Sequence, residues 1–194
     1  RSLTIREPGS PDSDIPRYQF GIVDRFEDFC SLQQTKEEEV GLSRMMAGFA
    51  WKWETKNNKD AFDIVIEGIP KRWNSTQKDW VNSANAVNEV GCIHTVQGYD
   101  LNYGFVILGP DIYYDSNKDA VNVNRANFKD AVAKKKASDD DLQKIIVNAY
   151  YVLMTRGMLG TYLYVCDPRA QRVPVTVYPG DIDLATALPH VTIL

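Results

Sequence analysis

Histidine and cysteine are scarce in this chain of 194 residues, which has 2 histidines and 3 cysteines. His94 and His190 are far apart and no C-x-x-C pair occurs, so the common nitrogen and sulfur ligands of a zinc site are missing. Cys30, Cys92 and Cys166 are widely separated, and each lies beside large apolar residues or within an apolar run. They are typical of reduced core thiols, and we therefore expect a cytoplasmic protein without a metal site.

Long apolar runs and an excess of positive charge are also missing. No run approaches the ~20 residues that a membrane span needs, so no membrane partner is expected. The net charge is −4, which argues against a protein that binds nucleic acid through nonspecific charge alone. The densest basic run, residues 134–136, is predicted to lie in a solvated loop, with contact to phosphate as the alternative.

The phosphate-binding pattern G-x-x-x-x-G-K-[ST] does not occur, and no acidic strand end of the Walker B type is convincing. This chain therefore lacks the loop that usually holds the phosphates of a nucleotide. The length leaves room for one domain with a substantial core. The first residue is Arg1 rather than methionine, which favours a piece of a longer protein.

Hydrophobic patterning predicts an α/β fold with a mostly parallel sheet flanked by helices. Strands are predicted at residues 18–23, 42–50, 91–95, 105–108 and 161–166. Residues 63–66 and 69–73 are predicted to form a β-hairpin inserted on this core. Residues 111–128 are polar and irregular, with a short hairpin through Val121 and Val123 as one option.

Two helices have recognisable end signals. Asp24 and Glu27 predict a capping box for the first helix, which Gly41 should end. Ser138 and Asp141 have the same spacing and open the second helix. The acidic run at residues 139–141 places negative charge at its amino-terminal end, where the helix dipole is positive.

The second helix is amphipathic and is predicted to end with a left-handed stop at Gly157. Its apolar face is expected to hold Leu142, Ile145, Ile146, Ala149 and Leu153. Arg156 extends this face, and a buried guanidinium needs a partner because an unpaired buried charge is unfavourable. The alternative is that Arg156 only binds the last carbonyls of the helix.

Residues 94–100, with the sequence His-Thr-Val-Gln-Gly-Tyr-Asp, form the most informative polar segment. It offers an imidazole, a hydroxyl, an amide and a carboxylate between two apolar runs. Loops at the ends of parallel strands are common ligand sites in α/β proteins. The alternative is an ordinary turn whose threonine and aspartate cap a helix and whose glutamine is solvated.

Together, residues 94–100 and the sequence Val-Leu-Met-Thr-Arg-Gly at 152–157 resemble motifs V and VI of superfamily 1 helicases. The wider sequence, including residues 43–53, 73–75 and 91–98, resembles the domain-of-unknown-function 2075 family, helicase-like ATPases related to the Schlafen helicase domain. This likeness runs from about residue 18 to residue 168, most of the chain.

The resemblance implies the second RecA-like lobe of a P-loop helicase or ATPase. The first, N-terminal lobe of the same polypeptide would hold most of the ATP and its Mg²⁺, and DNA or RNA would be the partner. Residues 1–17 are expected to be a flexible tail, residues 18–168 the lobe, and residues 169–194 an extended appendage.

The resemblance also implies individual roles around ATP. Arg156 takes the place of the motif VI arginine finger, which offsets charge on the transferred phosphoryl group. Gln97 and Gly98 match the motif V pair that senses the phosphate, and Asp100 matches an acidic residue that accepts from a ribose hydroxyl. Arg44 is the candidate equivalent of motif IV.

Nucleic-acid contacts are expected from two regions. His94 and Thr95 would face the ATP cleft or the groove for the strand. Trp51 and Trp53 are two of four tryptophans that are interleaved with basic residues. These indoles are expected either to stack on the bases of a single strand or to pack a hairpin onto the sheet.

Two other classes of protein remain open from the residues alone. A degenerate lobe would serve only as a platform for nucleic acid or protein. A stand-alone hydrolase would use His94 with Asp100 or Asp111 as its base, but no convincing nucleophile accompanies them.

Overall fold

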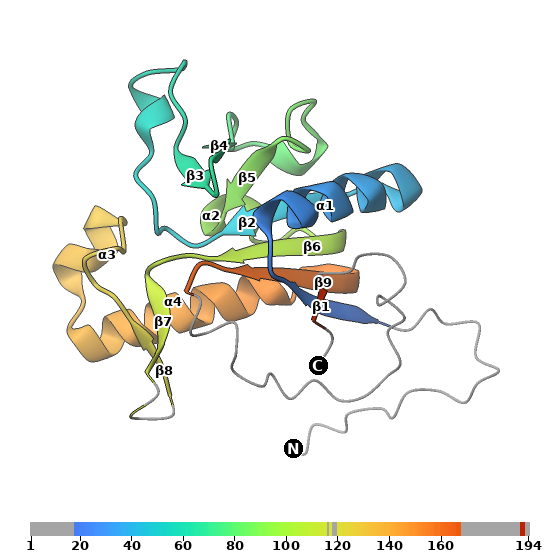
Figure 1. Ribbon diagram of the computed structural model, residues 1–194. Coiled ribbons are helices and arrows are strands. Elements are labelled where there is room, and N and C mark those ends of the chain that lie inside the picture. The colour runs from blue at the N-terminus through green and yellow to red at the C-terminus, as the bar shows by residue number, and fades with distance from the viewer. Residues whose placement is uncertain (1–17, 116, 118–119, 168–190, 193–194) are drawn as a thin grey trace.

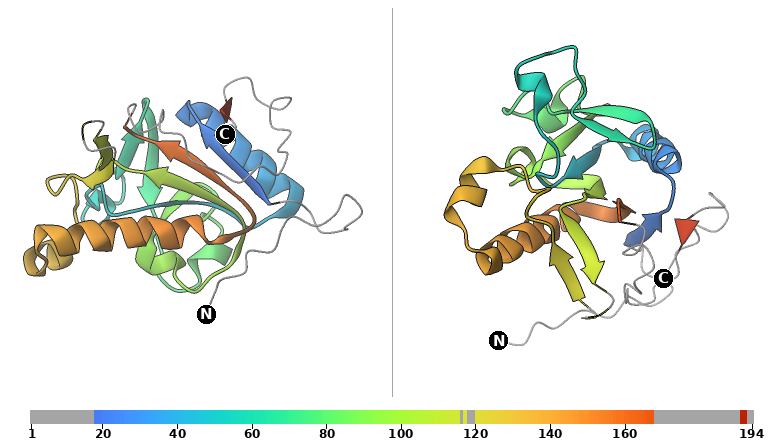
Figure 2. Two further views of the ribbon diagram at one scale, coloured as in Figure 1. Left: turned by 90° about the horizontal axis from the view of Figure 1, so that it is seen from below. Right: turned by 60° about the vertical axis from the view of Figure 1, so that its left-hand side comes forward.

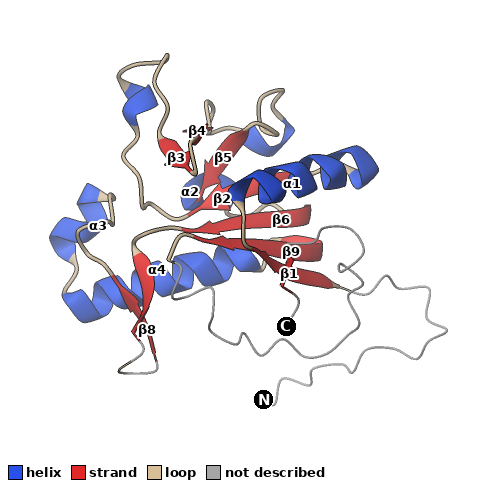
Figure 3. Cartoon of the chain, in the orientation of Figure 1, coloured by secondary structure: helices blue, strands red, loops and turns tan. Residues whose placement is uncertain are grey.

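The computed structural model describes residues 18–115, 117, 120–167 and 191–192. The predicted tail at 1–17 and nearly all of the predicted appendage at 169–194 lie outside these described residues. One large sheet runs through the domain in the order β10-β1-β9-β6-β2-β5-β4-β3 (Figure 1). Figure 3 shows the helices around this sheet and the small hairpin that projects from it.

Parallel pairing joins the strands in the middle of the sheet. They are β1 (Gln19–Val23), β9 (Gly157–Val165), β6 (Leu101–Leu108), β2 (Ser43–Ala47), β5 (Glu89–Cys92) and β4 (Ile69–Trp73). Antiparallel strands β10 (Val191–Thr192) and β3 (Ile64–Ile66) lie at the two edges. The predicted mostly parallel α/β sheet is confirmed.

Hairpins appear at both predicted positions. The β3–β4 hairpin was predicted as an insertion, but β4 also pairs in parallel with β5, so the hairpin extends the main sheet. A separate hairpin is formed by β7 (Ile112–Asp115) and β8 (Ala120–Val123). It includes the pair Val121 and Val123 that the sequence had marked as an option.

Helices cover both faces of the sheet (Figure 2). Helix α1 (Phe26–Val40) packs on one face, and α4 (Asp139–Met154) packs on the other. The short helices α2 (Ile93–Val96) and α3 (Ala131–Lys136) follow β5 and precede α4, respectively. Two 3₁₀ turns lie at Glu54–Lys56 and Trp80–Asn82.

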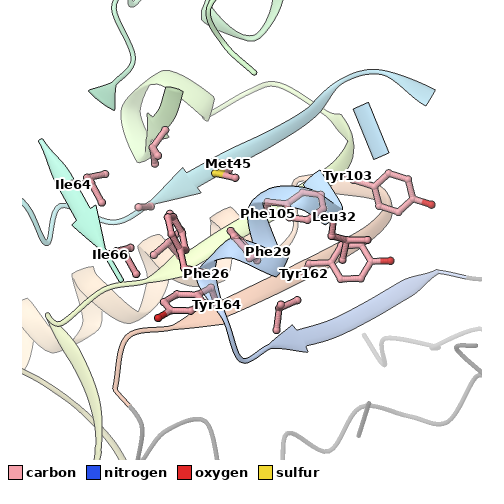
Figure 4. Close-up of a cluster of buried hydrophobic side chains, with 14 of the residues drawn as sticks. Phe26, Phe29, Leu32, Met45, Ile64, Ile66, Tyr103, Phe105, Tyr162 and Tyr164 are labelled. Carbon is pink, nitrogen blue, oxygen red and sulfur yellow. The ribbon is translucent and has the colours of Figure 1, made fainter. Parts of the chain in front are cut away.

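Alternating side chains of the central strands separate two hydrophobic clusters. Met45, Phe105 and Tyr162 lie in register on β2, β6 and β9, and they pack with the phenylalanines of α1 (Figure 4). Their sequence neighbours on the same strands belong to the cluster under α4. That second set is Met46, Val106 and Leu163, packed with Leu142, Ile146 and Leu153 of α4. The predicted apolar stripe of α4 is therefore largely buried, as its spacing indicates.

Helix α1 does not begin with the predicted capping box. Its N-cap is Arg25, and no side-chain capping bond is formed there. The Phe26 N–H instead donates to the carboxylate of Glu67 at 2.8 Å. Glu67 lies at the tip of the β3–β4 hairpin. The Asp24–Glu27 prediction is wrong because a carboxylate from a distant turn takes that place. Gly41 does follow the helix, with φ 72°, as predicted.

Helix α4 begins as predicted and ends differently. The Ser138 hydroxyl accepts the Asp141 N–H at 3.2 Å. At the other end Thr155 is the C-cap, and Gly157 starts β9 instead of forming a left-handed stop. A Cβ on Gly157 would overlap the carbonyl oxygen of Gly160. Glycine is therefore required for a close backbone approach rather than for a positive φ.

The strand predicted at residues 91–95 ends earlier, at Cys92. Ile93 and Val96 both pack into the cluster under α4, which a helical turn permits because residues three apart share a face. Gly98, with φ 90°, then redirects the chain toward β6. Strand β6 starts at Leu101, four residues before the predicted 105–108 strand.

Candidate functional site

The two helicase-like segments meet at one edge of the sheet. Leu101 at the start of β6 pairs with Gly157 at the start of β9, and its N–H donates to the Arg156 carbonyl at 2.9 Å. Asp100 and Arg156 each precede one of these strands. The segment from α2 to Asp100 therefore runs from the end of β5 to the edge where β6 and β9 begin. Residues that are far apart in the sequence are adjacent there.

The side chain of Arg156 is half-buried and lies beyond the last turn of α4. Its Nε donates to the Val152 carbonyl at 3.1 Å, and Nη2 donates to the Thr155 hydroxyl at 3.3 Å. Within the described part of the chain, no carboxylate forms an ion pair with it. The expected buried partner is therefore not found, because the helix ends before Arg156 and the guanidinium reaches the surface.

A β-bulge lies next to Arg156. Gly157 and Gly160 of β9 face Leu101 and Tyr103 of β6, so β9 holds one extra residue between these pairs. Met158, inside this bulge, is 67% exposed. Bulges often redirect side chains beside functional sites, and large exposed apolar side chains are informative on a surface. This edge therefore combines an exposed methionine with a guanidinium that has no acidic partner.

Gln97, Gly98 and Asp100 are exposed on the segment that leads to the same edge. Gly98 has φ 90°, a conformation that side chains rarely adopt, so glycine suits this turn. The Gln97 amide and the Asp100 carboxylate form no hydrogen bond with other described residues. Both polar groups are available to a ligand or a partner surface.

The predicted residues His94, Thr95 and Arg44 have different environments. The His94 side chain is 68% exposed, and its Nε2 lies 3.9 Å from the Asp130 carboxylate. Thr95 is buried, with its hydroxyl 3.1 Å from the Cys92 sulfur. Thr95 is thus directed into the fold, whereas His94 is accessible.

Arg44 is buried in β2 and fully engaged with the protein. Its Nη1 lies 2.7 Å from the Glu37 carboxylate, and its Nε donates to the Val81 carbonyl at 2.9 Å. This pairing satisfies a buried charge and joins α1 to the turn around Val81. Its guanidinium is therefore not brought together with Arg156.

Aromatic side chains form one contact network above the end of β2. The ring centroids of Trp53 and Trp73 are 5.8 Å apart, and those of Trp51 and Trp73 are 6.4 Å apart. Phe49 links this network to His94, with ring centroids 5.4 Å apart. Trp73 is buried, whereas Trp51 and Trp53 are half-buried. Packing explains Trp73, and the two half-buried indoles keep some ring surface exposed.

A cavity of about 220 Å³ lies between α2 and α4, and we call it the α4 cavity. It brings His94 and Gln97 together with residues that the sequence had not marked as a site. The lining is Gly48, Phe49, Ile93, His94, Gln97, Asp111, Phe128, Asp130, Ile145, Ile146, Asn148, Ala149, Tyr150 and Val152. No sequence motif connects the chain segments that supply this lining. Only the helical spacing of the lining residues on α4 indicated that those residues share a face.

Asp111 lies buried beside this cavity. Its Oδ1 accepts a 2.6 Å hydrogen bond from the Tyr150 hydroxyl, whose oxygen accepts the Gly109 N–H at 2.9 Å. Burial raises the pKa of Asp111 to about 6, and the bond from Tyr150 opposes this rise. A sealed carboxyl of this kind is poorly placed to act with the exposed His94 as a hydrolase base.

The described ranges also lack two kinds of feature. No cluster of three or more histidine, cysteine, aspartate or glutamate side chains there is arranged to hold a metal ion. In those same ranges, each helix is too short or too polar to cross a membrane.

Comparisons with known proteins point to one family. Residues 3–167 match the family described as Schlafen group 3, DNA/RNA helicase domain. The uncharacterized protein YPL245W of Saccharomyces cerevisiae is 32% identical over 166 residues, which are 81% of this chain and 36% of that protein. The chain thus spans about a third of this relative's length, and no solved structure matches it. Because the family match covers most of the sequence, the chain belongs to the Schlafen group 3 DNA/RNA helicase domain family.

Proposed function

We propose that this chain is the second RecA-like lobe of a nucleic-acid-dependent ATPase or helicase, of the type also seen in the domain-of-unknown-function 2075 family. In this proposal Arg156 acts as an arginine finger on ATP that a first lobe holds. Gln97 and Gly98 sense the phosphate, and Asp100 accepts a hydrogen bond from the ribose. The family membership supports the helicase-like theme.

One observation carries the proposal. The pairing of Leu101 with Gly157 places the segment ending at Asp100 beside Arg156, at the start of adjacent strands. Arg156 has no acidic partner among the described residues, and the segment beside it ends in the free Asp100 carboxylate and carries the Gln97 amide three residues earlier. These groups suit a nucleotide that offers phosphate oxygens and hydroxyls. The exposed Met158 beside it suits contact with another protein surface.

The remaining parts of the catalyst would come from outside these 194 residues. The chain has no glycine-rich phosphate loop and no Ser or Thr in a position to hold Mg²⁺. ATP and Mg²⁺ would therefore be held mainly by the first lobe of the same polypeptide. Arg44 is left out of this proposal, because its guanidinium is already paired with Glu37.

DNA or RNA is the proposed partner of the opposite edge, where β2 and β5 end. His94, Trp51 and Trp53 keep exposed or half-exposed ring surface there, which could stack on unpaired bases. The neighbouring Thr95 contributes to folding rather than to contact, since its hydroxyl faces the Cys92 sulfur.

A second candidate function is a platform that binds nucleic acid or protein without supporting catalysis. One observation favours it: Arg156 binds the Val152 carbonyl, as a cation does when it only caps a helix. The two functions differ in what a change at Arg156 should do.

Variants at Arg156 separate the two functions in the protein that carries both lobes. If Arg156 is a finger, Arg156→Ala should lower ATP turnover by a factor on the order of a thousand and leave ATP binding nearly intact. Arg156→Lys should restore little, because lysine lacks the planar fork that addresses two phosphate oxygens. Phosphate release and melting temperature would be measured on the same samples.

The capping function gives the opposite pattern. Both variants would then cost about 1 kcal/mol of stability or less, and lysine would replace arginine well. Normal turnover per folded molecule in Arg156→Ala would exclude the finger and leave the platform as the better function. Thr155→Ala, which alters a neighbour that also contacts the guanidinium, serves as the control for local disturbance.

A further inference from the structure

The α4 cavity has an apolar floor that the proposed ATPase function does not use. Ile145, Ala149 and Val152 line it from successive turns of α4. Phe49 and Phe128 add aromatic rings to the wall. Ile145 is 42% exposed although it belongs to the predicted apolar stripe. A ligand with a flat apolar face would cover this floor and remove it from water.

Polar groups surround the same floor. Gln97 and Asn148 present exposed amides, and each amide offers a donor and an acceptor together. The His94 imidazole packs against Phe49, and the Asp130 carboxylate lies 3.9 Å from His94. Paired donors and acceptors around an apolar floor match a nucleobase, whose faces are apolar and whose edge carries both kinds of group.

The volume of the α4 cavity and the charged residue near it further restrict the kind of ligand that fits. A cavity of about 220 Å³ has the volume of about seven water molecules, which suits one ring system rather than a whole nucleotide. Phosphates would then lie outside it. Lys134 follows Phe128 in the chain, and its amine donates a hydrogen bond to the Phe128 carbonyl at 3.4 Å. The Lys134 amine is therefore close to one residue that lines the cavity.

We propose that the α4 cavity binds a single nucleobase, with the base on the Ala149 floor, the Gln97 and Asn148 amides at its edge, and Lys134 near its phosphate. The source of the base rests on the proposed nucleic-acid function, since an unstacked base of a single strand and a free nucleotide share this chemistry. Arg156 is not among the residues that line the cavity. The two sites adjoin, because Val152 lines the cavity and accepts a hydrogen bond from Arg156, and Gln97 belongs to both.

Binding to the 194-residue chain tests the proposal. The probes are fluorescein-labelled single-stranded DNA and RNA, an abasic oligomer of the same length, and unlabelled nucleoside monophosphates as competitors. Ala149→Phe fills the cavity and should weaken binding of the base-containing strands by about 10- to 100-fold, the range for loss of one stacked base. Val147→Phe adds a similar ring on an exposed position of α4 outside the cavity and should bind like the native chain.

Competition by the monophosphates would assign the cavity to free nucleotides, and competition by strands alone would assign it to a strand; both results support base binding. Equal affinity of Ala149→Phe and the native chain would overturn the proposal. So would equal affinity for the abasic oligomer, or no binding of any probe by the native chain.

If Ala149→Phe lowers the melting temperature, Gln97→Ala replaces it. The amide is exposed and forms no hydrogen bond with other described residues, so this variant should fold normally and still bind more weakly. If Gln97→Ala binds the single-stranded probes as tightly as the native chain does, the result would contradict base binding in the cavity. Phosphate release does not enter this assay, so the base site and the arginine finger can fail independently.

Discussion

At the scale of single residues, Asp111 is the least expected group in the fold. It is a carboxyl with no exposed surface, and its Oδ2 has no hydrogen-bond partner among the described residues. The Tyr150 hydroxyl satisfies only Oδ1, at 2.6 Å. Burial disfavours the charged form, and this is why the pKa of Asp111 rises from 3.8 to about 6.

The raised pKa of Asp111 predicts a pH dependence of stability. The folded protein holds the proton more tightly than the unfolded chain, so stability is lost as pH rises from about 4 to about 6 and then stays lower. The loss is about 3 kcal/mol at neutral pH. The asparagine side chain of the Asp111→Asn variant cannot ionise, so this variant should not show the pH-dependent loss of stability.

Urea unfolding of the native chain and of Asp111→Asn at several pH values checks this prediction. The difference in unfolding free energy should change in favour of the variant between pH 4 and pH 6 and level off above that range. A difference that is constant from pH 4 to pH 8 would show that folding does not raise the pKa of Asp111. Tyr150→Phe removes the bond to Oδ1, together with the bond from the Gly109 N–H, and should increase the pH-dependent loss.

At the scale of elements, the β3–β4 hairpin stabilises the edge of the sheet and also the start of helix α1. Glu67 at its tip has φ 50° and accepts both the Phe26 N–H at 2.8 Å and the Tyr164 hydroxyl at 3.1 Å. The first bond satisfies a backbone donor at the start of α1, where Arg25 provides no side-chain cap. One carboxylate thereby joins the hairpin, α1 and the end of β9.

Replacing Glu67 should destabilise α1 through this contact. Glu67→Asn tolerates a positive φ but is one carbon shorter, so its side chain should not reach the Phe26 N–H, and a loss of about 1 kcal/mol is expected. Glu67→Gln keeps the length and an acceptor oxygen and should lose less. Thermal unfolding of the three proteins measures the difference. If the asparagine variant melts with the native chain, the cross-hairpin cap contributes little.

At the scale of the whole molecule, one sheet has helices on both faces (Figure 2). Polar candidate residues lie at both ends of its central strands. Arg156 and Asp100 lie where β6 and β9 begin, and His94 lies where β5 ends. The proposed ATP contact and the proposed strand contact would then be on different sides of one lobe. In the proposed function, the chain would complete a nucleotide site whose remaining parts lie on another lobe.

This arrangement predicts that the chain alone does not hydrolyse ATP. It has no phosphate-binding loop and no set of residues to position Mg²⁺. Steady-state phosphate release should equal that of buffer, with or without single-stranded nucleic acid. The matched control is the Arg156→Ala chain: activity that is present in the native preparation and lost in this variant would show that the chain holds a complete site.

Structural features were predicted correctly from the sequence where the residues that determine them are close together in the chain. Ser138 with Asp141, and Gly41 after α1, act within one helical turn, and both were predicted. The alternation of Met45 and Met46 between two faces likewise follows from strand geometry. The adjacency of Arg156 to the segment that ends at Asp100 was expected only through the family resemblance.

The sequence by itself therefore determined the α/β class, the mostly parallel sheet, the amphipathic α4 and the relation to the Schlafen helicase domain, although the domain-of-unknown-function 2075 label is not confirmed. Only the tertiary structure decided how α1 is capped, where β5 ends, which partner Arg156 has and how Asp111 is buried. These features join residues that are far apart in the chain, such as Phe26 with Glu67, 41 positions away, and Tyr150 with Asp111, 39 positions away. Local patterns carry no information about such contacts, because they form only when the packed sheet brings distant turns together.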